Sequence, residues 1–175
     1  MSVRAMRTDR LGRELNPLVC EARTLASALS EECDWFTGVP DSVLCKVVPL
    51  VEPYAAAPSE NHALGLAFGA RLGGKRPCLL IQNSGLGLLG DALLGLCHLY
   101  GVGVLLVVAW RGELAWEEPQ HLRWGAITPE LLRVYGVETF DLETEGLDAV
   151  RKAAREAFED GRTACVLVRR GNVDE

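Results

Sequence analysis

The sequence predicts an α/β fold in three layers, with a six-stranded, mostly parallel sheet covered by helices on both faces. Short apolar segments alternate with helical patterns along the chain, and this alternation gives parallel strands. Two segments, 78–82 and 102–109, are continuously apolar except for Gln82 at the end of the first, which is typical of strands buried on both faces. With 175 residues, 49% of them hydrophobic, we expect one domain over residues 17–175 and a loose arm over residues 1–16.

The individual elements follow from local signals. Asn16-Pro17 combines a capping side chain with a proline suited to a first helical turn, and apolar spacing then predicts a helix to Leu29. Thr128-Pro129 repeats this signal and predicts a later helix start. The expected strands span residues 34–37, 54–57, 78–82, 102–109, 137–142 and 164–168. The other expected helices span 42–51, 59–72, a segment after 87, and 146–159, and residues 110–126 are expected to form a polar loop.

Composition narrows the class of protein. The net charge of −6 and the absence of a basic face argue against a nucleic-acid partner. The six cysteines lack CxxC spacing, so we expect a reducing, cytoplasmic location and neither a zinc site nor a disulfide framework. The apolar run 86–109 is interrupted by Asp91, His98 and several glycines, so it predicts a helix and a strand and not a membrane span. Residues 1–16 carry arginines without an apolar stretch, unlike a secretory signal.

Polar or glycine-rich residues follow four successive expected strands. These segments are 38–42, the start of the helix at Glu60, 82–87 and 110–121. Ligands of parallel α/β sheets bind at the carboxyl ends of the strands, so we expect a site that these segments share. Connecting loops are polar in any protein, so one or two such segments would carry no meaning alone.

Glu60 is the main candidate for catalysis. It heads a helix that is almost free of other charges, where a carboxylate costs free energy unless it is paired or protonated. A chain tolerates that cost most readily when the group has a chemical role. The alternative is an ordinary acid in a first helical turn that Ser59 caps.

Gly85, Gly87 and Gly90 match the G-x-G-x-x-G pattern of dinucleotide-binding turns. The acid expected at the end of the next strand is missing, because Trp110-Arg111 stands there, and the pattern follows the third strand of the domain and not the first. Asp91 follows Gly90, but Gly-Asp-Ala is not the Gly-Asp-Gly of a magnesium-diphosphate site, so we predict no metal site in this chain. His121, taken alone, is typical of a surface histidine.

Together these motifs resemble the pyrimidine-binding domain of thiamine-diphosphate-dependent decarboxylases, from about Cys33 to the end of the chain. The helix start at Glu60, the turn Gly38-Val39-Pro40 and the turn 83–87 resemble the corresponding motifs of that superfamily. A narrower set resembles the phosphonopyruvate and sulfopyruvate decarboxylases, namely Phe36–Ser42, Gln82–Gly87, Trp110-Arg111-Gly112 and Glu118-Pro119-Gln120-His121. Leu88 and Asp91 depart from the asparagines that are usual in the family.

The resemblance implies a role for each matching residue. Glu60 would be catalytic and would hydrogen-bond the aminopyrimidine ring of thiamine diphosphate. The residues implied to bind the cofactor are Glu60, Asn83, Ser84, Gly85 and Leu86. Those implied to bind the substrate are Asp41, Ser42, Arg111, Gln120 and His121, and Arg111 and His121 would meet its phosphonate or sulfonate. The diphosphate-binding domain and its Mg²⁺ would lie on a partner beta subunit, which makes this chain the alpha subunit of a hetero-oligomer.

Three hypotheses about function follow. The first is a decarboxylase alpha subunit that converts 3-phosphonopyruvate to phosphonoacetaldehyde and CO₂ together with its beta subunit. The second is a sulfopyruvate decarboxylase alpha subunit that forms sulfoacetaldehyde. The third is a non-catalytic nucleotide-binding or regulatory subunit, which rests on the glycine pattern described above.

Overall fold

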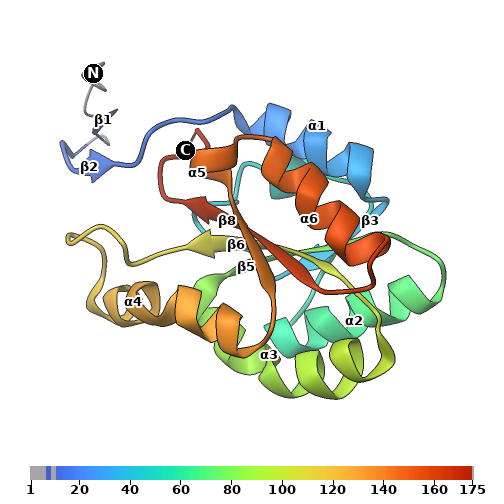
Figure 1. Ribbon diagram of the computed structural model, residues 1–175. Coiled ribbons are helices and arrows are strands. Elements are labelled where there is room, and N and C mark those ends of the chain that lie inside the picture. Colours follow the sequence, from blue (N-terminus) through green and yellow to red (C-terminus); the bar gives the residue numbers. More distant parts are fainter. Residues whose placement is uncertain (1–6, 9–10, 175) are drawn as a thin grey trace.

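The sheet has six strands, and every neighbouring pair runs parallel. The computed structural model describes residues 7–8 and 11–174, and the sheet occupies the centre of the molecule (Figure 1). In spatial order the strands are β4 (Tyr54–Ala56), β3 (Trp35–Gly38), β5 (Pro77–Gln82), β6 (Leu105–Trp110), β8 (Ala164–Arg169) and β7 (Glu138–Asp141). The six predicted strands and their parallel arrangement are therefore confirmed.

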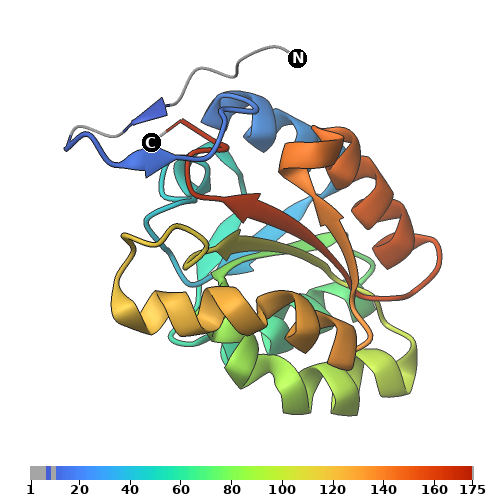
Figure 2. The same ribbon diagram turned by 60° about the vertical axis from the view of Figure 1, so that its left-hand side comes forward.

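Helices cover both faces of the sheet, which confirms the three layers (Figures 1 and 2). One layer contains α1 (Ala22–Glu32), α5 (Leu142–Glu145) and α6 (Asp148–Phe158). The other contains α2 (Glu60–Leu72), α3 (Leu86–Ala92), the π-helical continuation η3 (Leu93–His98) and α4 (Pro119–Val134). Two short 3-10 helices, η1 (Val48–Leu50) and η2 (Asn83–Gly85), complete the main elements. A separate antiparallel pair joins β1 (Arg7–Thr8) and β2 (Glu14–Leu15) in the expected arm, and residues 1–6 and 9–10 of that arm lie outside the described residues.

The core consists of two apolar clusters, one on each face of the sheet. Along β5, Cys78 and Leu80 belong to the cluster beneath α1 and α6, whereas Leu79 and Ile81 belong to the cluster beneath α2 and α3. Successive strand residues point to opposite faces, so a strand covered on both sides must be apolar at every position. This is the physical origin of the continuous apolar runs in the sequence.

The helix start predicted at Asn16-Pro17 is wrong, because α1 begins at Ala22. Residues 16–20 run extended beside the end of the chain. The backbone N–H of Asn16 donates to the carbonyl of Arg170 (3.2 Å), and Cys20 pairs with Val173 in an isolated parallel bridge. Pairing with a segment more than 150 residues away in the sequence thus overrides the local capping signal.

The predicted loop over 110–126 is also wrong in its second half. α4 begins at Pro119, so the predicted start at Thr128-Pro129 falls inside a helix. Pro129 has no N–H for the carbonyl of Gly125, four residues earlier, but that carbonyl accepts a hydrogen bond from Trp110 Nε1 (3.0 Å). The side chain of Trp110 thereby satisfies the group that the proline leaves without a helical partner.

A helix predicted over 42–51 is replaced by turns and the short η1 helix. Pro49 cannot donate the backbone hydrogen bond that a continuous α-helix would need at that position. Asp41 organises the start of the segment, because its Oδ1 accepts hydrogen bonds from the N–H groups of Val43 (2.7 Å) and Leu44 (3.2 Å). Among the helices of residues 7–8 and 11–174, none has the length and apolar character needed to cross a membrane.

Candidate active site

Glu60 is the first residue of α2 and follows the end of β4. Ser59 caps the helix, with its Oγ accepting from the N–H of His62 (3.5 Å). The Glu60 side chain is half-buried and lies flat against Gly85, where an added Cβ would stand 2.6 Å from Oε1 and 2.7 Å from Cδ of the carboxyl group. Within the described part of the chain this carboxylate has no hydrogen-bond or ion-pair partner. Glu60 is therefore an acid held in place by packing and left without a counter-ion.

The three glycines of the G-x-G-x-x-G pattern each make room for a side chain. Gly85 faces Glu60, as described above, Gly87 faces Trp124, and Gly90 faces Tyr135. An added Cβ would lie 2.6 Å from the Trp124 ring and 2.9 Å from the Tyr135 hydroxyl. Packing of α2 and α4 against this segment thus explains the spacing, and the dinucleotide interpretation loses its support.

Asn83 fixes the turn that carries Gly85. Its Nδ2 donates to the carbonyl of Arg111 (2.9 Å) and to Thr128 Oγ1 (2.8 Å), and its Oδ1 accepts from the N–H of Arg111 (3.3 Å). Asn83 and Leu86 are both fully buried, so only their backbones can face a ligand. Their side chains hold the turn from inside the protein. Gly85 is buried as well, and of the predicted cofactor residues Glu60 and Ser84 are the partly exposed ones.

Arg111 is the centre of a polar cluster at the end of β6. Its Nε pairs with Glu117 Oε1 (3.0 Å), its Nη1 donates to Ser42 Oγ (2.8 Å) and its Nη2 pairs with Glu118 Oε2 (2.8 Å). Glu117 Oε2 also accepts from the N–H of Gly112. The side chains of Arg111 and Glu117 are only 5% and 1% exposed, so this part of the cluster belongs to the interior.

His121 connects the Arg111 cluster to the turn at the end of β5. Its Nε2 lies 3.7 Å from Glu118 Oε2, and its Nδ1 lies 3.4 Å from Nε2 of Gln82, which also donates to Ser84 Oγ (2.8 Å). Burial, and next the positive charge of Arg111, lower the pKa of His121 below its ordinary value, so the ring is neutral near pH 7. The turn 82–85 therefore has Glu60 on one side and His121 on the other.

Asp41 and Gln120, the other two predicted substrate residues, differ in burial. The Oδ2 atom of Asp41 is buried without a hydrogen-bond partner among the described residues, and burial raises the pKa of this carboxyl group. The two backbone hydrogen bonds to its Oδ1, and then the charge of Arg111, act in the opposite direction. Gln120 is exposed on the first turn of α4, so it stands at the rim of the site and outside the network.

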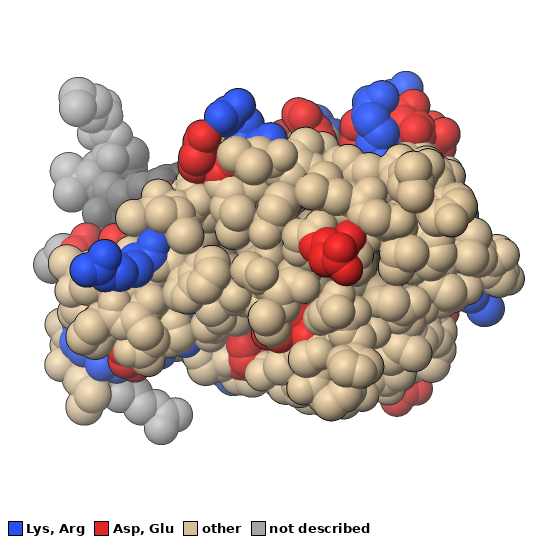
Figure 3. Space-filling model, turned by 90° about the horizontal axis from the view of Figure 1, so that it is seen from below, with Lys and Arg blue, Asp and Glu red and all other residues tan. Residues whose placement is uncertain are grey.

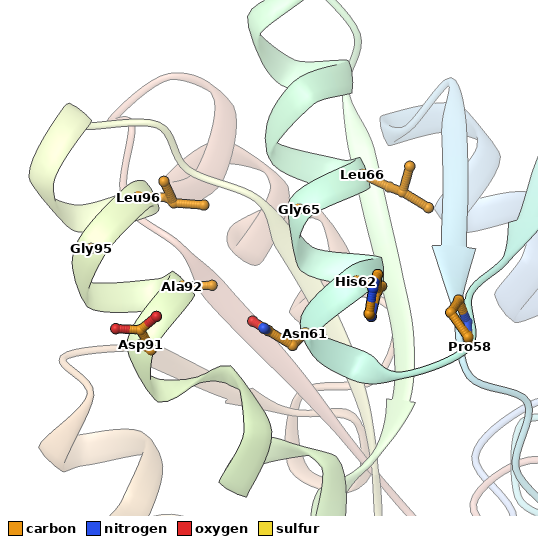
Figure 4. Close-up of a pocket in the computed structure, with 9 residues that line it drawn as sticks. All are labelled: Pro58, Asn61, His62, Gly65, Leu66, Asp91, Ala92, Gly95 and Leu96. Atoms are coloured by element: carbon orange, nitrogen blue, oxygen red, sulfur yellow. The ribbon is translucent and has the colours of Figure 1, made fainter.

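A groove runs beside Glu60 between α2 and the α3–η3 segment, with a volume of about 610 Å³. Figure 4 shows Asn61 of α2 pointing across it toward Asp91 and Ala92. The groove is lined by Pro58, Asn61, His62, Gly65, Leu66, Asp91, Ala92, Gly95 and Leu96. Its surroundings are nearly free of charge, because residues 77–110 contain one charged residue, Asp91. The layer that forms it exposes Leu66, Leu72, Leu88, Leu94, Leu99, Tyr100, Ile127 and Val134, and Figure 3 shows Lys and Arg only toward the margin of this face.

Comparison with known proteins identifies the family. No family model matches the chain. It is 36% identical over 107 residues to phosphonopyruvate decarboxylase of Streptomyces viridochromogenes, which covers 58% of this chain and 27% of that protein. It is 30% identical over 116 residues to the sulfopyruvate decarboxylase subunit alpha of Methanocaldococcus jannaschii, covering 63% of this chain and 69% of the relative. The chain belongs to the phosphonopyruvate and sulfopyruvate decarboxylase family. It spans about a quarter of the Streptomyces relative.

Solved structures agree with this family at the level of the fold. The chain superposes on a 2-oxoglutarate:ferredoxin oxidoreductase from Magnetococcus marinus with a TM-score of 0.65, at 19% identity over 86% of this chain and 28% of the other. It superposes on benzoylformate decarboxylase from Polynucleobacter necessarius with a TM-score of 0.58, at 14% identity over 95% of this chain and 35% of the other. The doubly covered parallel sheet of this family member is therefore a fold shared with larger enzymes.

The structure adds residues that the motifs did not single out for the site. Glu117 is the buried partner of Arg111, and Gln82 joins His121 to Ser84. Glu117 and Glu118, two adjacent acids before Pro119, could have signalled that one carboxylate is buried and the other exposed. Which of the two is buried depends on where α4 packs. In the described residues, no group of three or more His, Cys, Asp and Glu side chains is placed to hold a metal ion, and all six cysteines are free thiols.

Proposed function

We propose that this chain is the alpha subunit of a thiamine-diphosphate-dependent 2-keto acid decarboxylase, and that its substrate is 3-phosphonopyruvate, which it converts to phosphonoacetaldehyde and CO₂. The observation that carries the proposal is the Glu60 carboxylate, which packs on Gly85 and has no partner in the described chain. An acid that packing holds in place and that has no partner in the described chain is suited to pair with a ligand, as acids of functional sites do.

The residues around Glu60 fit the aminopyrimidine of thiamine diphosphate. The Glu60 side chain fills the space that a side chain at residue 85 would take, and its carboxylate can pair with a flat ring that brings nitrogen donors and acceptors to one edge. Glu60 would hold or share a proton with the ring nitrogen. When bound, the cofactor supplies the electron sink for decarboxylation. Its diphosphate and Mg²⁺ are assigned to the partner chain, because this chain lacks the Gly-Asp-Gly signature.

The polar cluster beyond the turn is assigned to the substrate. Arg111 and His121 would meet the acidic head group, and Ser42, whose Oγ accepts a hydrogen bond from Arg111, would complete that side of the site. Asp41 and Gln120 would lie at the two margins, one beneath the cluster and one at its exposed rim. The contacts through the turn 82–85 support placing this head group across from Glu60.

The proposed partner is a beta subunit that carries the diphosphate-binding domain, in a hetero-oligomer within a reducing cytoplasm. The groove beside Glu60 and the uncharged face around it support this, because exposed apolar patches of this kind mark interaction surfaces. Leu66→Asp would place a charge at the edge of the groove. We expect it to weaken binding of the beta subunit by on the order of 10-fold or more, with Leu18→Asp, on the opposite layer, as the matched control.

A second candidate substrate is sulfopyruvate, which would yield sulfoacetaldehyde. It is supported by the similarity to the Methanocaldococcus jannaschii relative, whose name describes a subunit alpha and which the chain covers to 69% of its length. The two acids share the 2-keto acid group and differ in the head group, a phosphonate or a sulfonate, that the Arg111 cluster would receive.

The experiment that tests the function is reconstitution with a chain that carries the Gly-Asp-Gly domain, in the presence of thiamine diphosphate and Mg²⁺. The pair is expected to release CO₂ and aldehyde from 3-phosphonopyruvate, and the single chain is expected to be inactive. A higher kcat/KM with sulfopyruvate would select the second candidate. Absence of turnover with both acids by a pair that binds the cofactor would refute the assignment as a decarboxylase.

A further inference from the structure

Glu118 is the exposed carboxylate of the Arg111 cluster. Its side chain is 52% exposed, compared with 1% for Glu117 and 5% for Arg111. A single oxygen, Oε2, receives Arg111 Nη2 at 2.8 Å and lies 3.7 Å from His121 Nε2. Glu118 thus puts a carboxylate oxygen between the two cationic or donor groups that the proposed function assigns to the substrate's head group.

The two carboxylates of the cluster are not equivalent in how easily they could leave. Glu117 is enclosed and also accepts from the N–H of Gly112, so removing it would strand a buried charge. Glu118 precedes Pro119 at the N-cap position of α4, and its carboxylate can rotate into water without uncovering the core. The structure therefore separates a permanent counter-ion from a replaceable one.

The charges of the cluster support the same distinction. Arg111 and Arg170 both face Glu117, with Arg170 Nη1 at 3.8 Å from its Oε1, and Glu118 brings the sum of these four formal charges to zero. If the Glu118 carboxylate turns away, Arg111 keeps one carboxylate partner, Glu117, to which Arg170 also lies close. An incoming oxyanion is then the natural replacement.

The orientation of His121 suits an anion in that position. Its Nδ1 faces the amide Nε2 of Gln82 at 3.4 Å, so in the neutral ring the proton belongs on Nε2, which points toward Glu118. Arg111 Nη2 and His121 Nε2 thereby form two donors that converge on one acceptor oxygen.

We infer that the Glu118 carboxylate occupies, in the free chain, the position taken by the substrate's phosphonate or sulfonate, and that the substrate binds by displacing it from Arg111 and His121. This inference rests on the proposed function for the identity of the substrate. It makes Glu118 a determinant of head-group affinity: an exposed placeholder that keeps Arg111 oriented and lowers the affinity for every anionic ligand of the site.

The test compares Glu118→Gln and Glu118→Ala with the wild-type chain in the reconstituted pair. Without the competing carboxylate, KM for 3-phosphonopyruvate and sulfopyruvate is expected to fall by on the order of 10-fold, with kcat little changed. KM for pyruvate, which has no acidic head group, is expected to stay the same. Glu113→Gln is the matched control, because Glu113 is a carboxylate of the same loop that pairs with Arg169 and not with Arg111.

Binding without turnover separates this inference from the decarboxylase assignment. Phosphonoacetate is titrated into the wild-type chain and the variants by calorimetry, and we expect tighter binding to Glu118→Gln than to the wild type or Glu113→Gln. Equal or weaker binding, or a loss of kcat at unchanged KM, would overturn the placeholder role. Tighter phosphonoacetate binding by a pair that decarboxylates neither acid would support the anion site and reject the proposed reaction.

Discussion

Glu60 and Arg111 both contact the turn 82–85, Glu60 at Gly85 and Arg111 at Asn83, but only one of the two charges has partners in the described chain. The guanidinium of Arg111 has Ser42 and two carboxylates around it, all supplied by this chain. The carboxylate of Glu60 rests on a glycine and, within residues 7–8 and 11–174, has neither a hydrogen bond nor an ion pair. The charge of Arg111 is compensated by groups of this chain, and the charge of Glu60 has no such partner in the described residues.

The difference indicates which charges serve the fold and which serve a ligand. A buried ion must be compensated locally, because the cost of removing it from water is several kcal/mol. Arg111 meets this condition through Glu117, so its position is part of the stability of the domain. Glu60 is only partly buried and starts α2, whose N-terminus favours a carboxylate, so the fold needs no counter-ion for it and its oxygens can serve a ligand or another chain. Substitutions on the two sides should therefore affect different measurements.

The largest effect is expected for Glu60→Gln. Loss of a positioned acid–base group typically lowers the rate by about 10²–10⁴-fold, so kcat of the reconstituted pair should fall by that order. The free energy of unfolding of the chain should fall by less than about 1 kcal/mol, because the partly exposed carboxylate gains only the favourable field of the α2 N-terminus from the fold. Denaturant unfolding and steady-state kinetics measure the two quantities, and Asp91→Asn serves as a control acid across the groove. A variant that loses more stability than this together with activity would contradict the contrast with Arg111.

Arg111→Ala should act mainly on the free energy of unfolding, whereas Glu60→Gln acts mainly on kcat. Removing the guanidinium leaves Glu117 buried and uncompensated, which lowers the free energy of unfolding by about 3–5 kcal/mol. Urea denaturation of the isolated chain measures this change. Arg133→Ala breaks an arginine–glutamate pair that is fully accessible to solvent and should change stability little. A stable Arg111→Ala chain with only a raised KM would assign the residue to the substrate alone.

Gly85→Ala tests whether packing, and not the carboxylate alone, defines the Glu60 side. The new Cβ would stand 2.6 Å from Oε1 of Glu60, so the side chain must move away from its present position. A displacement of about 1 Å in a catalytic group can cost on the order of 100-fold in kcat. Gly69→Ala is the matched control. Gly69 lies on α2, the helix of Glu60, with open space around it, so alanine should stabilise that helix slightly. Equal kinetics for the two variants would exclude the contact as a determinant of activity.

The sequence predicts most of this fold because its strands are buried on both faces. The runs that became β5 and β6 are apolar up to Gln82, the last residue of β5, so the pattern leaves little choice of structure. The errors fall where a local signal competes with a distant contact. Asn16-Pro17 and Thr128-Pro129 are good helix starts locally, worth about 1 kcal/mol. Pairing with the end of the chain and the hydrogen bond from Trp110 outweigh them.

The site was predicted unevenly for a related reason. Glu60 could be found because it stands alone at a helix start, and the turn around Gly85 because its glycines are spaced for a close approach. The sequence could not show which of the two loop acids is buried, because the burial of Glu117 and the exposure of Glu118 depend on how α4 lies against the end of β6. Local sequence specifies which groups reach the strand ends, and helix packing decides which of them remain available.

The smallest effect is expected from His121, whose ring joins the two sides. Burial, and next the charge of Arg111, hold the pKa of His121 in the folded chain below its ordinary value. The unfolded chain therefore binds this proton more tightly, so the stabilisation is complete above about pH 6.5 and is lost as the pH falls through the folded-state pKa. Between about pH 7.5 and 5, the free energy of unfolding should fall more for the wild type than for His121→Gln. The raised pKa of Asp41 is common to both chains and cancels in this difference. Equal slopes would show that the fold does not lower the pKa of His121, which would contradict its burial beside Arg111.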